Sequence, residues 1–158
     1  MDDYSKLIPY LISEFEDFKV FQKHLNKQID YSKASFDLYG SKITSWEEVG
    51  NVTKIGGYLD LYETPITSLG NLQTVGGYLY LYKTPITSLG NLKSVGGYLN
   101  LAKIPITSLG NLQSVGGILD LRKTPDLTDI GELREVKGQI YYDKGTKAEE
   151  LLKERGLI

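Results

Sequence analysis

Residues 56–75 read GGYLDLYETPITSLGNLQTV, and residues 76–95 repeat them almost letter for letter as GGYLYLYKTPITSLGNLKSV. Residues 96–115 follow as GGYLNLAKIPITSLGNLQSV, and a fourth copy begins at Gly116 with GGILDLRKTP. Self-similarity with a period of twenty residues is typical of a solenoid, in which each turn of chain buries its apolar face only against its neighbours. The flanking segments therefore have to fit a stack of repeated turns.

Each repeat contains two different spacings of apolar residues. Leu59 and Leu61 alternate, which is the period of a β-strand. The apolar residues that follow stand three apart, which suits tight turns or 3₁₀ coil and does not suit an α-helix: Ile66, Leu69, Leu72 and Val75. One coil of chain can point all of these side chains inward, so they are the predicted core.

Threonines and glycines also hold fixed places in the repeat. We expect Thr64, Thr84 and Thr124 to turn inward and bond backbone groups at the end of the strand, and Ile104 interrupts that column. A Gly-Gly pair precedes each strand, at residues 56–57, 76–77, 96–97 and 116–117. The pairs indicate either positive φ angles or a close approach of chains at a corner. A phosphate-binding loop is disfavoured, because no Gly-Lys-Ser/Thr and no helix start follow.

The whole pattern resembles the leucine-rich repeat family in its short bacterial-type form, with Thr64, Thr84 and Thr124 where the usual consensus has Asn. The segment SLGNLQSVGG is also similar to the β-helix of receptor L-domains. The resemblance covers about residues 36–146. It implies a right-handed solenoid with a parallel β-sheet of about six short strands on one face and irregular turns on the other. It implies no activity.

The chain is most simply one α+β domain of 158 residues in three parts. Residues 1–34 are predicted to form an N-terminal helical cap, 35–145 the solenoid and 146–158 a C-terminal helical cap. Thr146 and Glu149 form a capping-box signature before the last helix, and Gly156 stands where a helix-ending glycine would. The first part carries an apolar stripe at helical spacing: Leu7, Leu11, Phe15, Phe18, Phe21 and Leu25. A partner-binding amphipathic helix is the alternative to a cap there.

Composition excludes several classes of function. The formal net charge is −2 and the chain has no cysteine, so disulfides, thiolate metal sites and cysteine nucleophiles are excluded and no basic field points to nucleic acid. We expect no cofactor and no metal. No apolar run approaches membrane-spanning length, and the acidic start lacks the features of a signal peptide, so we expect a cytoplasmic protein without membrane contact.

The outward positions of the strands form columns, because side chains alternate along a strand and the turns stack in register. Three of these columns carry a group of tyrosines: Tyr39, Tyr58, Tyr62, Tyr78, Tyr80, Tyr82 and Tyr98. Strand propensity and cross-strand stacking partly explain them. Tyrosine is also a rigid, amphipathic contact residue, so an exposed group of tyrosines indicates an interaction surface.

A lysine column runs beside the tyrosines: Lys83, Lys103, Lys123 and Lys144. It is either a solvated edge or a surface that attracts an acidic partner, protein or RNA. Tyrosines with a basic rim also suit single-stranded nucleic acid, although Asp60, Glu63 and Asp120 interrupt the surface. Trp46, the only tryptophan, lies in a three-residue insertion and either fills the end of the core or forms a contact site.

Catalytic chemistry is weakly indicated. His24 is the only histidine, and no Ser-His-Asp set can be built around it. Asp37 and Asp60 are expected one turn apart, near the carboxylate separation of a retaining glycosidase, but any adjacent pair in a stacked sheet has that spacing. We therefore expect an exposed, unpaired carboxylate pair and no enzyme.

The sequence thus predicts a non-catalytic protein that binds a protein partner. The predicted contact residues are the seven tyrosines with Lys83, Lys103 and Lys123. A more specific hypothesis is an inhibitor of the kind that phages and mobile elements carry, directed at a host defence nuclease and so anti-CRISPR-like. The alternative is a nucleic-acid or carbohydrate binder that uses tyrosine stacking with a lysine rim.

Overall fold

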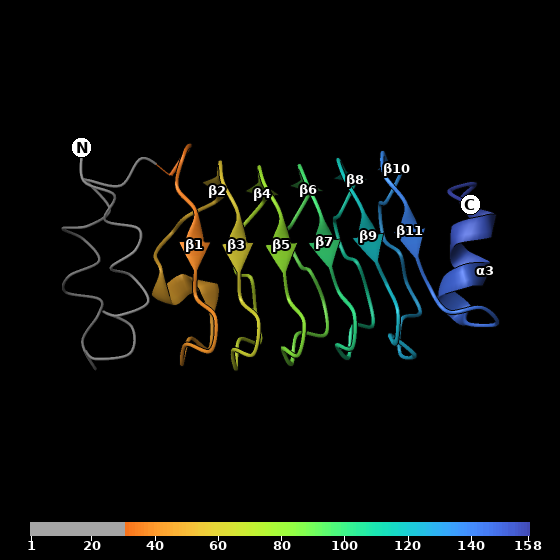
Figure 1. Ribbon diagram of the computed structural model, residues 1–158, viewed down its shortest axis with the longest axis horizontal. Coiled ribbons are helices and arrows are strands. Elements are labelled where there is room, and N and C mark those ends of the chain that lie inside the picture. Colours follow the sequence, from red (N-terminus) through yellow and green to blue (C-terminus); the bar gives the residue numbers. More distant parts are fainter. Residues whose placement is uncertain (1–30) are drawn as a thin grey trace.

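The computed structural model describes residues 31–158, and Figure 1 shows their arrangement as a stack of similar turns that ends in one helix. Residues 1–30 of the predicted N-terminal helical cap, with its apolar stripe and His24, lie outside the described residues, and residues 31–33 form a turn. No helix among residues 31–158 is long and apolar enough to cross a membrane.

The main sheet is made of one short strand from each turn. Its parallel strands are β1 (Phe36–Asp37), β3 (Leu59–Asp60), β5 (Leu79–Tyr80), β7 (Leu99–Asn100), β9 (Leu119–Asp120) and β11 (Ile140–Tyr141), hydrogen-bonded in that order. Leu59 pairs with Leu79 and Leu79 with Leu99, so each turn repeats the register of the one before. This arrangement confirms the predicted parallel solenoid with a period of about twenty residues.

A second parallel sheet lies where the spacing of three predicted only turns or 3₁₀ coil. Its strands are β10 (Glu135–Val136), β8 (Ser114–Val115), β6 (Ser94–Val95), β4 (Thr74–Val75) and β2 (Lys54–Ile55), in that order. The expectation of irregular turns throughout the other face is therefore wrong. Strands β2, β4, β6 and β8 each end a turn just before a glycine pair, and β10 ends just before Lys137 and Gly138. Stacking places its backbone against that of the next turn, so ladder bonds form without a long strand.

The core is the set of inward residues that the repeat predicts. Leu59, Leu61, Ile66, Leu72 and Val75 have no exposed surface, and the equivalent residues of the next turns are buried in the same way. The threonine column is also confirmed, because the Oγ1 atoms of Thr64, Thr84 and Thr124 donate to the carbonyls of the residues three before them at 2.8, 2.7 and 2.6 Å. Apolar burial and a threonine bond to a backbone carbonyl thus occur together in these three turns, and Ile104 replaces the threonine in the turn between Thr84 and Thr124.

The glycine pairs allow the backbones of neighbouring turns to approach closely, and none of the paired glycines has a positive φ angle. A Cβ on Gly96 would lie 2.0 Å from the carbonyl oxygen of Gly76, and one on Gly116 would lie 2.2 Å from that of Gly96. Positive φ occurs at other glycines, such as Gly90 with φ 56°. A side chain at the pairs would therefore force the stacked turns apart.

The three-residue insertion forms a 3₁₀ helix, η2 (Trp46–Glu48), with Ser45 as its N-cap and a complete capping box with Glu48. The Trp46 side chain is 1% exposed, packs edge-on against Phe36 and donates its Nε1–H to the Val52 carbonyl at 2.9 Å. Trp46 therefore fills the core, and its interpretation as a contact site is wrong.

The C-terminal helix α3 (Lys147–Glu154) covers the last turn, as predicted (Figure 1). The Thr146 hydroxyl accepts from the Glu149 N–H, whereas the Glu149 carboxylate bonds the Gly145 N–H, one residue earlier than in a standard capping box. Gly156 ends the helix with φ 72°, and the Leu157 N–H bonds the Leu152 carbonyl in a Schellman motif. Leu152 is fully buried, which closes the apolar end of the stack.

Candidate partner-binding face

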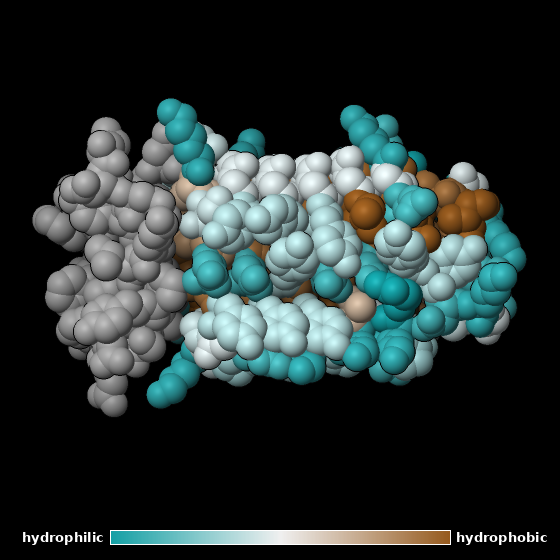
Figure 2. All heavy atoms as spheres, in the orientation of Figure 1, coloured by the Kyte–Doolittle hydropathy of each residue, from teal (hydrophilic) through white to brown (hydrophobic). Residues whose placement is uncertain are grey.

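The outward surface of the main sheet carries all of the predicted contact residues. Figure 2 shows this face, where two rows of weakly polar side chains run across the strands with hydrophilic residues between them. We call the first group the tyrosine ladder, made of Tyr39, Tyr62 and Tyr82, and the second the tyrosine cluster, made of Tyr58, Tyr78, Tyr80 and Tyr98. The structure thus brings the seven tyrosines together on one face, in two separate groups.

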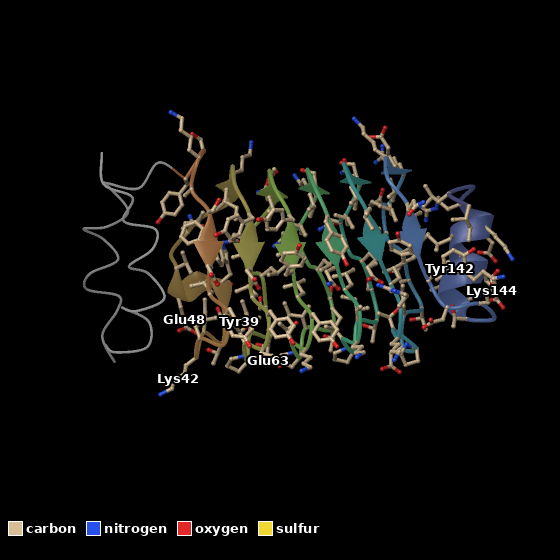
Figure 3. The ribbon with its side chains drawn as sticks, in the orientation of Figure 1. Tyr39, Lys42, Glu48, Glu63, Tyr142 and Lys144 are labelled. Carbon is tan, nitrogen blue, oxygen red and sulfur yellow. The ribbon has the colours of Figure 1, made fainter. Side chains whose placement is uncertain are left out.

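The tyrosine ladder is a continuous stack of rings along the solenoid. The ring centres of Tyr39 and Tyr62 are 5.1 Å apart, and those of Tyr62 and Tyr82 are 5.2 Å apart with planes within 4° of parallel. The Tyr39 ring is the most exposed, at 59%, and its hydroxyl donates to Glu63 at 3.2 Å (Figure 3). These contacts follow from the turn spacing, which matches the separation of stacked rings.

The tyrosine cluster is packed more irregularly. Tyr58 and Tyr78 stack with centres 4.9 Å apart, Tyr78 and Tyr80 are tilted at 5.1 Å, and Tyr80 meets Tyr98 edge-on at 5.4 Å. Tyr78 remains 40% exposed. Partial burial raises the pKa of Tyr80, and burial together with the nearby Asp120 raises the pKa of Tyr98 to about 12. The Tyr80 and Tyr98 phenols therefore stay neutral near pH 7 and act as hydrogen-bonding groups.

The column of outward residues next to the tyrosine ladder contains Tyr80, and its other members from the first to the fifth strand are carboxylates and one amide. The Oδ1 atoms of Asp37, Asp60 and Asn100 accept the N–H of the residue two places on, at 3.2, 2.9 and 3.0 Å. The expected unpaired pair of Asp37 and Asp60 is therefore wrong, because both carboxylates cap backbone groups at the ends of their strands. Burial, followed by the charge of Asp37, raises the pKa of Asp60 although its bond from the Tyr62 N–H opposes this.

Asp120 continues this column but is almost completely buried, with 1% of its surface exposed. Arg122 covers it, donating from Nη2 to Oδ2 at 2.6 Å and from Nε to Oδ1 at 2.9 Å, and the Tyr98 hydroxyl adds a bond to Oδ2 at 3.2 Å. Burial acts to raise the pKa of Asp120, but these bonds and the charge of Arg122 outweigh it and hold the pKa below its usual range. Its predicted place on an open surface is therefore wrong.

The positions just past the strands hold Glu63, Lys83, Lys103 and Lys123, each with a left-handed φ between 57° and 60°. Lys83 pairs with Glu63 at 2.7 Å, and its Nζ lies 5.6 Å from the ring centre of Tyr62. Lys103 lies over the Tyr82 ring at 5.2 Å. Among residues 31–158, neither the Lys103 nor the Lys123 ammonium group forms an ion pair with a carboxylate.

Arg122 and Tyr141 belong to this face and were not among the predicted contact residues. The Arg122 guanidinium lies 5.0 Å from the ring centre of Tyr141, which is 39% exposed. The sequence feature that could have identified Arg122 as a contact residue is its place in the column of the tyrosine ladder, two turns after Tyr82. Within the part of the chain that the structure describes, no three His, Asp or Glu side chains gather in a way that would hold a metal ion.

Comparison of the chain with protein-family models, with curated proteins and with solved structures gives no match. The fold and the chemistry of this face are therefore the basis for a function.

Proposed function

We propose that this chain is a non-catalytic binding protein that engages a protein partner through the tyrosine-rich face of a leucine-rich-repeat-like solenoid. The observation that carries the proposal is the presence of seven tyrosines on one face of a stacked sheet. Ring stacking and the short strands restrict these side chains before a partner arrives, so little conformational entropy is lost on binding. The inward leucines and the period of about twenty residues support the leucine-rich-repeat likeness.

The distribution of charge favours a protein over a nucleic-acid strand. A strand laid along the tyrosine ladder would meet Asp37, Asp60 and Glu63 on the first turns, and the Lys83 charge is already matched by Glu63. Phosphate binding needs several unmatched cations along its path. A protein surface can instead place apolar, polar and basic groups opposite the same residues.

The more specific proposal is an inhibitor of a host defence nuclease, of the kind that mobile elements carry. It is supported by the nearly identical repeats of the chain. The same contact face would serve such an inhibitor, and identification of the partner tests the idea directly.

The test begins with capture of partners from bacterial lysate, identification by mass spectrometry and affinity measurement with the purified partner. Replacing Tyr78 and Tyr80 with Ser should weaken binding at least about 30-fold, because central aromatic contacts dominate interface energies. The matched control is the pair Lys93→Ser and Gln113→Ser, two exposed residues beside the second sheet, which should leave the affinity unchanged.

Full affinity of the double tyrosine variant, with its fold confirmed by circular dichroism, would refute the proposed face. Nucleic acid that co-purifies with the chain, and that nuclease treatment removes, would instead support the nucleic-acid binder. The ratio of absorbance at 260 nm to absorbance at 280 nm, measured on the purified chain, reports bound nucleic acid before any partner is known.

A further inference from the structure

The tyrosine ladder stops abruptly after its third ring. Tyr39, Tyr62 and Tyr82 occupy one outward column, but the next turn places Ala102 there and the one after it Arg122. In Figure 2 the corresponding row of weakly polar side chains ends towards the C-terminal side and gives way to hydrophilic residues. One turn of the column therefore lacks a ring, between an aromatic face and a guanidinium group.

A depression of about 280 Å³ lies at this place, lined by Tyr82, Ala102, Lys103, Arg122 and Lys123. We call it the ring slot. Adjacent turns are about 4.8 Å apart, so the Tyr82 and Arg122 positions are separated by about 9.6 Å. A planar ring inserted at the Ala102 turn would lie about 4.8 Å from the Tyr82 ring, which is within the range of aromatic stacking, and the Arg122 side chain would line its other side. The existing ring separations of 5.1 and 5.2 Å show that this column accommodates stacked rings.

The two side chains on either side of the ring slot, Tyr82 and Arg122, are held in place by neighbouring residues. Arg122 is fixed by its two bonds to the buried Asp120 carboxylate and by the Tyr141 ring beneath its guanidinium. Tyr82 is fixed by stacking on Tyr62. Lys103 currently lies over the open side of the Tyr82 ring, and as an exposed four-carbon chain it can move aside and pair with an anion at the rim.

Two lysines, Lys103 and Lys123, form the rim of the ring slot, and both have a left-handed backbone conformation. Lys103 and Lys123 both have φ 58°, a left-handed conformation that favours glycine, and the first turn does have a glycine at this position, Gly40 with φ 62°. Neither ammonium group forms an ion pair with a carboxylate among residues 31–158, although the Lys123 backbone N–H donates to the Asp143 carboxylate at 2.6 Å. The same conformation recurs at Glu63 and Lys83, so it belongs to the repeat, and Lys103 and Lys123 differ from that pair because their ammonium groups are not matched by a carboxylate within the described residues.

We propose that the ring slot receives an aromatic side chain from an acidic segment of the protein partner, so that the partner's ring completes the tyrosine ladder and its carboxylates meet Lys103 and Lys123. This inference rests on the proposed function and names the chemistry of the partner. A nucleotide also combines a ring with anionic groups, but the carboxylates on the first turns oppose a phosphate chain along the ladder. The peptide is therefore the favoured occupant, and the nucleotide is a competing outcome of the test.

The test uses the full chain and short probes, observed by nuclear magnetic resonance of the Ala102 methyl and Tyr82 ring. The probe is the blocked pentapeptide Asp-Glu-Trp-Glu-Asp. Its controls are the same peptide with Leu for Trp, the peptide with Lys at all four flanking places, and adenosine monophosphate. We expect the acidic Trp peptide to shift the Ala102 methyl upfield through the ring current and to bind at least tenfold more tightly than any of the three controls.

The decisive variant is Ala102→Tyr, which fills the slot with the residue that the two preceding turns already carry. It should keep the fold, as judged by circular dichroism, and reduce peptide affinity at least tenfold, whereas Ala102→Ser keeps the slot and the affinity. Should Ala102→Tyr fail to fold, Lys103→Gln with Lys123→Gln provides a second route, and it should reduce both the affinity and its salt dependence.

Equal binding of the acidic peptide to wild type and Ala102→Tyr would overturn the inference, as would tighter binding of adenosine monophosphate than of the peptide. The two proposals fail separately. If Tyr78→Ser with Tyr80→Ser abolishes binding of the captured partner while Ala102→Tyr leaves both partner and peptide binding intact, the proposed function stands and the ring slot is refuted.

Discussion

Replacing Asp120 with Asn, and separately Asp60 with Asn, isolates the effect of charge in the carboxylate column. Both aspartates accept a backbone N–H two residues on through Oδ1, and Asn100 makes the same bond at 3.0 Å. An asparagine amide oxygen can therefore replace that bond at either site. The two substitutions differ in the other interactions that they remove, so we expect them to change the free energy of unfolding differently.

At Asp120 the change removes a buried carboxylate from its partners. The new amide nitrogen would face Arg122 Nη2, which now donates to Oδ2 at 2.6 Å, and two donors cannot bond each other. A hydrogen bond to a charged group contributes about 1.5–3 kcal/mol, so we expect Asp120→Asn to lower the free energy of unfolding by about 2 kcal/mol at pH 7. At Asp60 the change instead removes a partly buried charge near Asp37, so stability should stay unchanged or rise.

The pH dependence gives a second check with a defined sign. The pKa of Asp120 is lowered in the folded state, so its contribution is present above the unfolded value of about 3.9 and is lost as pH falls through the folded pKa. The pKa of Asp60 is raised, so its penalty grows as pH rises from the unfolded value through the folded pKa. Both differences from wild type should therefore be largest near neutral pH and shrink in acid.

Urea unfolding at pH 7 and at pH 3.5, followed by circular dichroism and by the fluorescence of the single buried Trp46, measures these effects. Equal losses of stability in the two variants at pH 7 would refute the reasoning, because they would show that the charge and its burial do not distinguish the two sites.

Two further predictions concern the stack itself. Gly96→Ala should lower the free energy of unfolding by about 3 kcal/mol, since the new Cβ would lie 2.0 Å from a backbone oxygen of the preceding turn, while Gly90→Ala, with open space but φ 56°, should lose only about 1 kcal/mol. If urea titrations show equal losses of stability in the Gly96→Ala and Gly90→Ala variants, the glycine pairs are not needed for the close approach of neighbouring turns. Thr84→Val removes the bond to the Leu81 carbonyl and should cost about 1 kcal/mol, whereas Thr84→Ser should retain the bond. A Val variant as stable as wild type in thermal melts would show that the hydroxyl does not matter.

The internal repeat by itself determined the architecture of residues 31–158. A period of twenty residues fixes the stack, and alternation within a strand fixes which of Leu59, Asp60 and Leu61 face inward. The capping residues Thr146 and Gly156 also fixed the ends of α3, because they satisfy local backbone groups that depend on few distant contacts. Such features are carried by residues that are neighbours in the sequence.

Only the tertiary structure decided features that depend on residues one turn away. The burial of Asp120 follows from Tyr98 on the preceding turn and from the path of the Arg122 side chain, and neither is encoded in strand alternation. The second sheet likewise arises because stacking aligns two-residue segments that are too short to form a strand alone. The ring slot has the same origin, since Ala102 is an ordinary small residue in the sequence. It becomes a gap in the tyrosine ladder only when stacking sets it between Tyr82 and Arg122.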